Sequence, residues 1–165
     1  MKKEQVSHPF PPLYDKNSKI LILGSFPSVK SRQQMFFYGH SQNRFWKVVS
    51  HILNETTPTT IEEKRTFLLK NNIALWDVIA QCKILNSSDS SISNVVVNDL
   101  SVILKNADIK YIYVNGKTAE TYYNKYTKNI INKDAICLPS TSPANAAYSL
   151  EKLIEKWNII KQGLD

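Results

Sequence analysis

Short apolar runs alternate with longer amphipathic segments along most of the chain. The apolar runs at residues 19–23, 73–79, 111–114 and 134–138 each have the length and composition of a buried strand. Segments between and after these runs carry apolar residues at the spacing of a helix face. Strands that alternate with helices predict a parallel sheet with helices on both faces, and therefore an α/β fold.

The clearest helix prediction falls at residues 44–53, where the apolar side chains share one face. Further helices are predicted at residues 61–70, 98–105 and 117–126, and a last one ends near residue 160. Residues 1–18 are rich in proline, which opposes regular structure, so we expect an extended N-terminal arm. No repeat or long linker divides the chain, and residues 1–165 are predicted to form a single domain.

Three loops that follow predicted strands are rich in Ser, Asn and Pro: residues 24–43, 77–91 and 138–145. Open α/β proteins bind their ligands at the carboxyl ends of the strands. The three loops are therefore expected to converge on one cleft, although each could be a simple turn. In the first loop Tyr38 lies beside Gly39 and His40, where an aromatic face could stack on a nucleobase.

The composition narrows the class of partner. Apolar residues make up 42% of the chain, the formal net charge is +7 and the isoelectric point is about 9.3. A small basic domain favours a polyanion such as nucleic acid, although a solvated basic surface would give the same balance. The two cysteines and three histidines lack metal-ligand spacing, so we predict no metal site. No apolar run reaches membrane-spanning length, and we expect a cytoplasmic protein.

Nucleotide and nucleophile motifs are absent from the sequence. Residues 116–118 read Gly-Lys-Thr, but Tyr111 stands where a phosphate-binding loop requires its leading glycine. No GxGxxG run follows a predicted strand, so a dinucleotide cofactor is not indicated. Ser25 and Ser140 are candidate nucleophiles, but no feature of the sequence pairs either one with a histidine.

Two motifs connect the chain with a known family. The first is GSFPS at residues 24–28 together with YGHSQNRFW at residues 38–46, and the second is LPSTSPANA at residues 138–146. With the run NSSDSSISNVV at residues 86–96, this pattern resembles the uracil-DNA glycosylase superfamily, and most of all its hypoxanthine-DNA (deoxyinosine) glycosylase branch. Ser41 departs from the related mismatch-specific enzymes, which carry a proline there.

The resemblance implies a three-layer α/β/α sandwich with a four-stranded parallel sheet, and excision of a damaged base without cofactor or metal. Phe26 stands where the superfamily usually carries an Asp or Asn that handles water, and Leu138 stands where uracil-specific members carry a histidine. Both usual catalytic positions are therefore apolar. In the hypoxanthine branch the polar role moves to Asn43, although an asparagine before a helix could also be only its cap.

The remaining roles also follow from the resemblance. Tyr38 corresponds to a base-stacking aromatic, Phe26 to the pocket floor, and Asp77 lies near a base-reading position. The expected base pocket comprises Ser25, Phe26, Tyr38, His40 and Asp77. The residues expected to contact DNA are Ser28, Lys30, Arg32, Ser140, Thr141, Ser142 and Asn145, with Arg44 and Lys47 as further basic groups.

The prediction from sequence is thus a monofunctional DNA glycosylase that releases hypoxanthine, with damaged DNA as its partner and no membrane or nucleotide cofactor. Nothing in the sequence requires more than a monomer. Two alternatives stay open: the same reaction on uracil or xanthine, and a catalytically inactive DNA-binding module, which the apolar Phe26 and Leu138 would suit.

Overall fold

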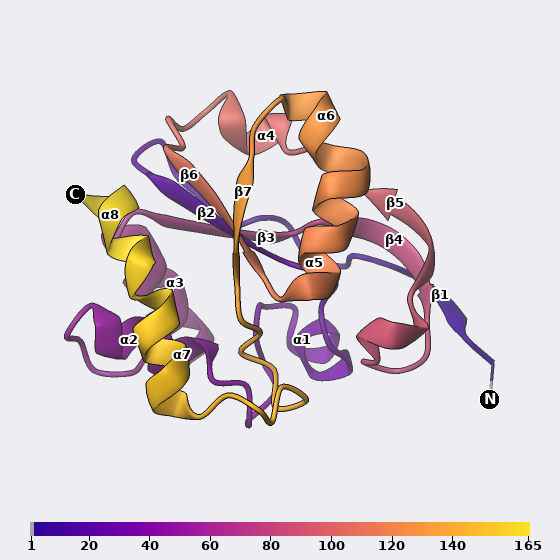
Figure 1. The fold of residues 1–165 in the computed structure, drawn as a ribbon, viewed down its shortest axis with the longest axis horizontal. Coiled ribbons are helices and arrows are strands. Elements are labelled where there is room, and N and C mark those ends of the chain that lie inside the picture. Colours follow the sequence, from indigo (N-terminus) through magenta and orange to yellow (C-terminus); the bar gives the residue numbers. More distant parts are fainter. Residues whose placement is uncertain (1) are drawn as a thin grey trace.

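A computed structural model describes residues 2–165, and a four-stranded parallel sheet lies at its centre (Figure 1). The strands follow the order β3 (Ile73–Asp77), β2 (Ile20–Gly24), β6 (Tyr111–Asn115) and β7 (Ala135–Leu138). All five residues of β2 are buried, as are all five of β3. Burial on both faces explains why these strands read as continuous apolar runs, and the predicted sheet is confirmed.

Helices cover both faces of this sheet and complete a three-layer α/β/α architecture (Figure 1). One layer contains α2 (Phe45–Ile52), α3 (Ile61–Lys70), α7 (Leu150–Trp157), the short turn η3 (Asn158–Ile160) and α8 (Lys161–Leu164). The other contains α5 (Lys117–Tyr122), the π-helical turn η2 (Tyr123–Thr127) and α6 (Lys128–Ile131). The short α4 (Ser101–Leu104) precedes β6. Within residues 2–165, none of these helices is long and apolar enough to cross a membrane.

A second, antiparallel sheet was not predicted. It contains β1 (Glu4–Ser7), β4 (Ile79–Ile84) and β5 (Ser93–Val97), with β4 in the middle. The prediction of a loop over residues 77–91 was therefore wrong, because only the 84–93 connection with its turn η1 (Asp89–Ser91) is loop-like. The prediction for the arm was wrong over residues 4–7, since its prolines begin only at Pro9.

The loop predicted at residues 24–43 also contains an unpredicted helix, α1 (Val29–Gln34). Ser28 caps its first turn by accepting a hydrogen bond from the Ser31 N–H at 3.1 Å. Met35 ends the helix in the left-handed region, with φ of 59°. Six residues are too few for apolar periodicity to stand out, which is why the sequence read as a loop.

The first and last parts of the chain meet through α2 and α7. Phe45 and Trp157 are both fully buried, and their rings meet edge to face at 5.8 Å. The indole N–H of Trp157 donates to the Pro139 carbonyl at 2.8 Å. This contact fixes the loop after β7 beside the start of α2, where the two family-like motifs lie.

Candidate active site

A cleft of about 980 Å³ opens at the carboxyl ends of the parallel strands. Residues from all three loops named above line it, as does Asn115 at the end of β6. The predicted site residues that line it are Ser25, Phe26, Ser28, Tyr38, His40, Asn43, Asp77, Ser140, Thr141, Ser142 and Asn145. Lys30 and Arg32 do not line it. Within residues 2–165, no group of three or more His, Cys, Asp or Glu side chains is arranged to hold a metal ion.

One side of the cleft, which we call the Asn43 wall, consists of Asn43, Asn115 and Thr141. The Oδ1 of Asn43 accepts from the Phe45 N–H and from the Thr141 hydroxyl, both at 2.9 Å. Asn115 donates to that hydroxyl at 3.0 Å and accepts from the Thr141 N–H at 3.1 Å. These bonds run in one direction, from Asn115 through Thr141 to Asn43, and hold the Asn43 amide in one orientation.

Asn43 combines a structural role with a chemically available group. Both acceptor positions of Oδ1 are taken, one of them by the N–H of Phe45, the first residue of α2, although the N-cap residue of that helix is Arg44. Its Nδ2 makes no hydrogen bond within residues 2–165. A site built on Asn43 therefore offers a donor rather than an acceptor to a ligand in the cleft.

Thr141 supports this arrangement instead of contacting DNA. Its side chain has no exposed surface, and its hydroxyl is shared between Asn43 and Asn115. A phosphate outside the protein cannot reach that hydroxyl. The expected DNA-contacting role of Thr141 is therefore replaced by a positioning role behind Asn43.

Arg44 is also committed within the protein. Its backbone N–H donates to the Thr141 carbonyl at 3.0 Å, and its guanidinium donates to the Ser142 carbonyl at 3.1 Å and the Asn145 carbonyl at 3.0 Å. A further bond joins it to the Tyr148 carbonyl. Arg44 therefore holds the loop after β7 in place. The sequence had suggested that Arg44 is a free cation for a DNA phosphate, and this expectation is replaced by the structural role.

The loop after β7 keeps its shape through its own polar groups. Ser140 Oγ accepts from the Ser142 N–H at 3.1 Å, and the amide of Asn145 donates to the Ser140 carbonyl at 2.9 Å. The Ser142 hydroxyl accepts from the Ala144 N–H at 3.2 Å. Gly116, with φ of 96°, lies against Ser140, where an added Cβ would come within 3.1 Å of its side chain.

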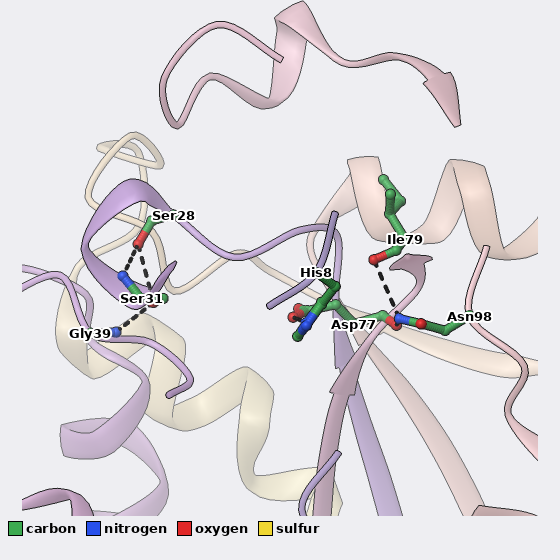
Figure 2. A network of polar contacts seen from close by, with 7 residues as sticks. All are labelled: His8, Ser28, Ser31, Gly39, Asp77, Ile79 and Asn98. Carbon is green, nitrogen blue, oxygen red and sulfur yellow. Dashed lines mark hydrogen bonds and ion pairs between the residues drawn. The ribbon is translucent and has the colours of Figure 1, made fainter. Parts of the chain in front are cut away.

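A second group of residues, which we call the Asp77 wall, consists of Asp77 and Tyr38, which line the cleft, and His8, which contacts Asp77 without lining the cleft. Asp77 ends β3, and its Oδ2 lies 2.7 Å from Nε2 of His8 (Figure 2). The two side chains are only 5% and 4% exposed. Asn98 donates to the Asp77 carbonyl at 2.9 Å and so fixes the backbone that carries the carboxylate.

Tyr38 places a buried hydroxyl on the same wall. Its ring stacks on Phe45 with centroids 4.2 Å apart, and its backbone is left-handed with φ of 50°. The hydroxyl is buried and finds no hydrogen-bond partner within residues 2–165. Burial, and then the negative charge of Asp77, raise the pKa of Tyr38 well above its ordinary value. The phenol therefore stays protonated and remains a hydrogen-bond donor.

Ser25 and Asp89 face the cleft as a hydrogen-bonded pair, with the Ser25 hydroxyl donating to Oδ1 of Asp89 at 2.9 Å. The Asp89 side chain stays accessible to solvent because the cleft is open. The surrounding protein nevertheless removes part of the hydration of this carboxylate, which raises the pKa of Asp89. The hydrogen bond from Ser25 lowers this pKa, and the negative charge of Asp77 raises it. Asp89 was not predicted, because its serine-rich segment indicated only a loop.

Phe26 and Arg32 lie together beside the cleft. Phe26 is 7% exposed, and the Arg32 guanidinium lies 5.6 Å from the centre of its ring. That guanidinium also donates to the Asn86 carbonyl at 2.8 Å, so Arg32 joins α1 to the loop after β4. His40 lies on the exposed rim, where its Nδ1 accepts from the Gln42 N–H at 3.1 Å.

Sequence reasoning missed His8, Asp89, Asn115 and the cleft-lining Lys117 and Lys156. The strand ends gave one usable signal, because Asn115 directly follows an apolar run as Asp77 does. His8 and Asp77 are 69 positions apart, and no local pattern connects them.

These motifs, the fold and the cleft agree with one family. The model of the Uracil DNA glycosylase superfamily matches residues 11–162. The chain therefore belongs to the uracil DNA glycosylase superfamily.

Two individual relatives of the chain carry the name of one branch of this superfamily. The chain is 34% identical over 153 residues to a protein of Methanosarcina acetivorans named Hypoxanthine DNA glycosylase, covering 92% of this chain and 95% of that one. A protein of the same name from Methanosarcina barkeri is 36% identical over 115 residues, covering 68% and 73%. The resemblance to the hypoxanthine branch is thus confirmed.

A solved structure supports the fold. The solution NMR structure of a Methanosarcina acetivorans protein, described as a candidate uracil DNA glycosylase, superposes with a TM-score of 0.81. It is 32% identical to this chain, and the match covers 98% of this chain and 99% of that one.

Proposed function

We propose that this protein is a monofunctional DNA glycosylase that flips deoxyinosine out of DNA and hydrolyses its N-glycosidic bond, releasing hypoxanthine. The observation that carries the proposal is Asn43, whose Oδ1 is fully bonded and whose Nδ2 is left to a ligand in the cleft. The names of the two Methanosarcina relatives support the choice of base.

Cleavage of a glycosidic bond needs stabilisation of the departing base. The sugar becomes oxocarbenium-like in the transition state, and negative charge grows on the leaving base. A donor fixed in place before the reaction stabilises that charge without reorganisation. The Nδ2 of Asn43 supplies such a donor, held by Thr141 and Asn115. The same side chain is a poor water activator, because Oδ1 has no free acceptor position.

The two apolar positions argue against the uracil-type mechanism. Phe26 and Leu138 are 7% and 3% exposed, so both line the cleft as buried apolar surface. Neither can position water or donate to a base. Hypoxanthine leaves more readily than adenine, so one well-placed donor suits its release.

Base recognition falls to the Asp77 wall. Hypoxanthine presents a ring N–H beside a carbonyl, and Asp77 offers an acceptor for that N–H. Gly24 allows this arrangement, because a Cβ there would lie 2.4 Å from Oδ1 of Asp77. Tyr38 adds a buried donor, while Ser25, Phe26 and His40 complete the proposed pocket.

DNA would bind along the rim of the cleft. Ser28, Ser140, Ser142 and Asn145 line the rim, and Lys117 and Lys156 add positive charge there. Lys30 and Lys47 are exposed nearby in sequence. With a net charge of +7, we expect the affinity for duplex DNA to fall steeply as salt rises, and a salt titration of binding checks this. We further propose a cytoplasmic monomer that needs no metal or cofactor.

Single-turnover cleavage with excess protein tests the function. Labelled duplexes carry one central deoxyinosine, deoxyuridine, deoxyxanthosine or deoxyadenosine, and alkali then opens the abasic sites. We expect product mainly from deoxyinosine, and a rate loss of about 10²- to 10³-fold in Asn43→Ala. Asn129→Ala, at an exposed position on α6, is the matched control.

The other outcomes decide between the alternatives. Product mainly from deoxyuridine or deoxyxanthosine would keep the reaction and change the base. No product from any duplex, with salt-sensitive binding retained, would favour an inactive binding module, which the apolar Phe26 and Leu138 would explain.

A further inference from the structure

The N-terminal arm places a histidine against Asp77, a residue that lines the cleft. His8 follows β1, and its backbone N–H donates to the Ala80 carbonyl at 2.7 Å, which extends the pairing of β1 with β4. Pro9 keeps His8 extended. Further along, Leu13 exchanges two backbone hydrogen bonds of 2.9 Å with Leu75 of β3. The arm is therefore pinned on both sides of His8.

The imidazole of His8 is buried among aromatic rings and touches one charged group. Its ring centre lies 4.5 Å from that of Phe10 and 6.1 Å from that of Phe26. Nε2 lies 2.7 Å from Oδ2 of Asp77, while Nδ1 is buried and has no partner among residues 2–165. We assign the hydrogen to Nε2, because this tautomer leaves only a lone pair unpartnered and gives Asp77 a donor.

The second oxygen of Asp77 is left open to the cleft. Oδ1 makes no hydrogen bond within residues 2–165, and it is not among the buried atoms that lack a partner, so solvent reaches it. It lies over the Cα of Gly24, close to the Tyr38 hydroxyl. His8 thus occupies one carboxylate oxygen and leaves the other facing the site.

We propose that His8 is a positioning residue for base recognition, which holds Asp77 so that Oδ1 accepts the ring N–H of the excised base. This role rests on the proposed function and deepens it. Hypoxanthine carries a hydrogen at N1, whereas N1 of adenine is an acceptor with no hydrogen. An acceptor fixed at Oδ1 therefore favours the deaminated base over the normal base from which it arises, because adenine would leave the carboxylate unpaired.

The contribution of the His8–Asp77 pair to folding stability does not explain why the pair is present. A buried, hydrogen-bonded charge contributes little compared with an apolar pair of similar shape, because both groups lose their hydration. Here the cost is increased by the unpartnered Nδ1. A residue chosen only to anchor the arm among Phe10, Phe26 and Phe37 would be apolar.

The experiment combines two variants with a modified substrate. His8→Gln can return an N–H donor near the Nε2 position, and His8→Leu cannot. His51→Leu, at an exposed histidine of α2, is the matched control. Single-turnover rates at saturating protein, and the protein concentration at half-saturation, are measured on duplexes with deoxyinosine, N1-methyldeoxyinosine or deoxyadenosine. Thermal unfolding and nitrogen NMR shifts of the His8 ring are measured in parallel.

We expect wild type to cleave deoxyinosine and not its N1-methyl derivative. His8→Leu should lose about 10- to 100-fold in saturated rate on deoxyinosine, and His8→Gln should recover most of it. The NMR shifts should show Nε2 protonated. If wild type cleaves N1-methyldeoxyinosine as fast as deoxyinosine, the proposal is overturned. This result needs only the wild-type protein and does not depend on whether a variant folds. A folded His8→Leu with the wild-type rate, or a folded His8→Gln as slow as His8→Leu, also overturns the proposal. Absence of wild-type cleavage of deoxyinosine would instead overturn the proposed function, and this role with it.

Discussion

The two walls of the cleft differ in how completely their polar groups are paired. Within residues 2–165, every side-chain oxygen of the Asn43 wall has a partner, and the Nδ2 of Asn43 makes no hydrogen bond. In the same part of the chain, Nδ1 of His8 and the hydroxyl of Tyr38 are buried without a partner, and Oδ1 of Asp77 makes no hydrogen bond but is reached by solvent. Unpaired polar groups are rare inside proteins and tend to gather where a ligand completes them.

This difference indicates that one wall acts on the leaving base and the other selects the base. A group that acts on the leaving base must be held still before the reaction, and the chain Asn115–Thr141–Asn43 achieves this. A group that selects the base needs free capacity that only the correct base fills, and the Asp77 wall keeps that capacity. The account can therefore be tested by disturbing one wall at a time.

A large effect is expected from filling the space beside Asp77. In Gly24→Ala the new Cβ would lie 2.4 Å from Oδ1 of Asp77 and 3.3 Å from the Tyr38 hydroxyl. Asp77 cannot turn away without losing His8, so the acceptor is displaced. We expect the single-turnover rate on deoxyinosine to fall on the order of 10²-fold.

Gly39→Ala is the matched control for that change. Its Cβ would meet the end of the flexible, exposed Gln34 side chain at 2.5 Å, which can move aside. Its rate should stay near that of wild type. A full rate in Gly24→Ala would contradict the account of the Asp77 wall.

A smaller effect is expected from loosening the Asn43 wall. Thr141→Val keeps the shape of the side chain but removes the bonds to Asn43 and Asn115. We expect a loss of about 1 kcal/mol in the free energy of unfolding, and a roughly five- to tenfold lower rate. Denaturant unfolding and single-turnover assays measure the two. Thr141→Ser, which retains the hydroxyl, should preserve both, and equal losses in the two variants would rule out the hydrogen bond as the cause.

The smallest effect concerns stability against pH at Asp89. Because the folded protein raises the pKa of Asp89 above the ordinary aspartate value of 3.8, its protonated form favours folding. The contribution is complete below that value and is lost as pH rises through the folded pKa. Asp89→Asn keeps an acceptor for Ser25 and does not titrate. The melting temperature of Asp89→Asn minus that of wild type should therefore increase as the pH rises from about 3 to about 6. A constant difference, or a change of opposite sign, would show that the pKa of Asp89 is not raised.

The sequence predicted the parallel sheet well because strands buried on both faces are continuously apolar, as in β2 and β3. It did not reveal β4 and β5, which include several polar side chains; in β5 half-buried and exposed positions alternate. Strands of this kind look like loops when serines surround them.

The site residues likewise include some that the sequence reveals and some that it does not. Asn43 and Tyr38 could be found because each lies in a motif that resembles the family, and Asp77 because it ends a predicted strand. His8 could not be found, because its role depends on a partner 69 positions away. Asn115 also follows an apolar run, but its role depends on Thr141, 26 positions away. The roles expected of Thr141 and Arg44 changed for a related reason: hydrogen bonds within the fold occupy groups that looked free in the sequence.

In the proposed reaction Asn43 acts through its Nδ2 donor, while its Oδ1 only holds the Asn43 wall together. Asn43→Asp separates the two functions, since it keeps an oxygen for Phe45 and Thr141 and replaces the donor with a second oxygen. The direct measurement is its single-turnover rate on deoxyinosine duplex, with unfolding measured alongside. We predict wild-type stability and a rate lower by about 10²- to 10³-fold. A rate equal to or above that of wild type would contradict the account and would make Asn43 a group that handles water.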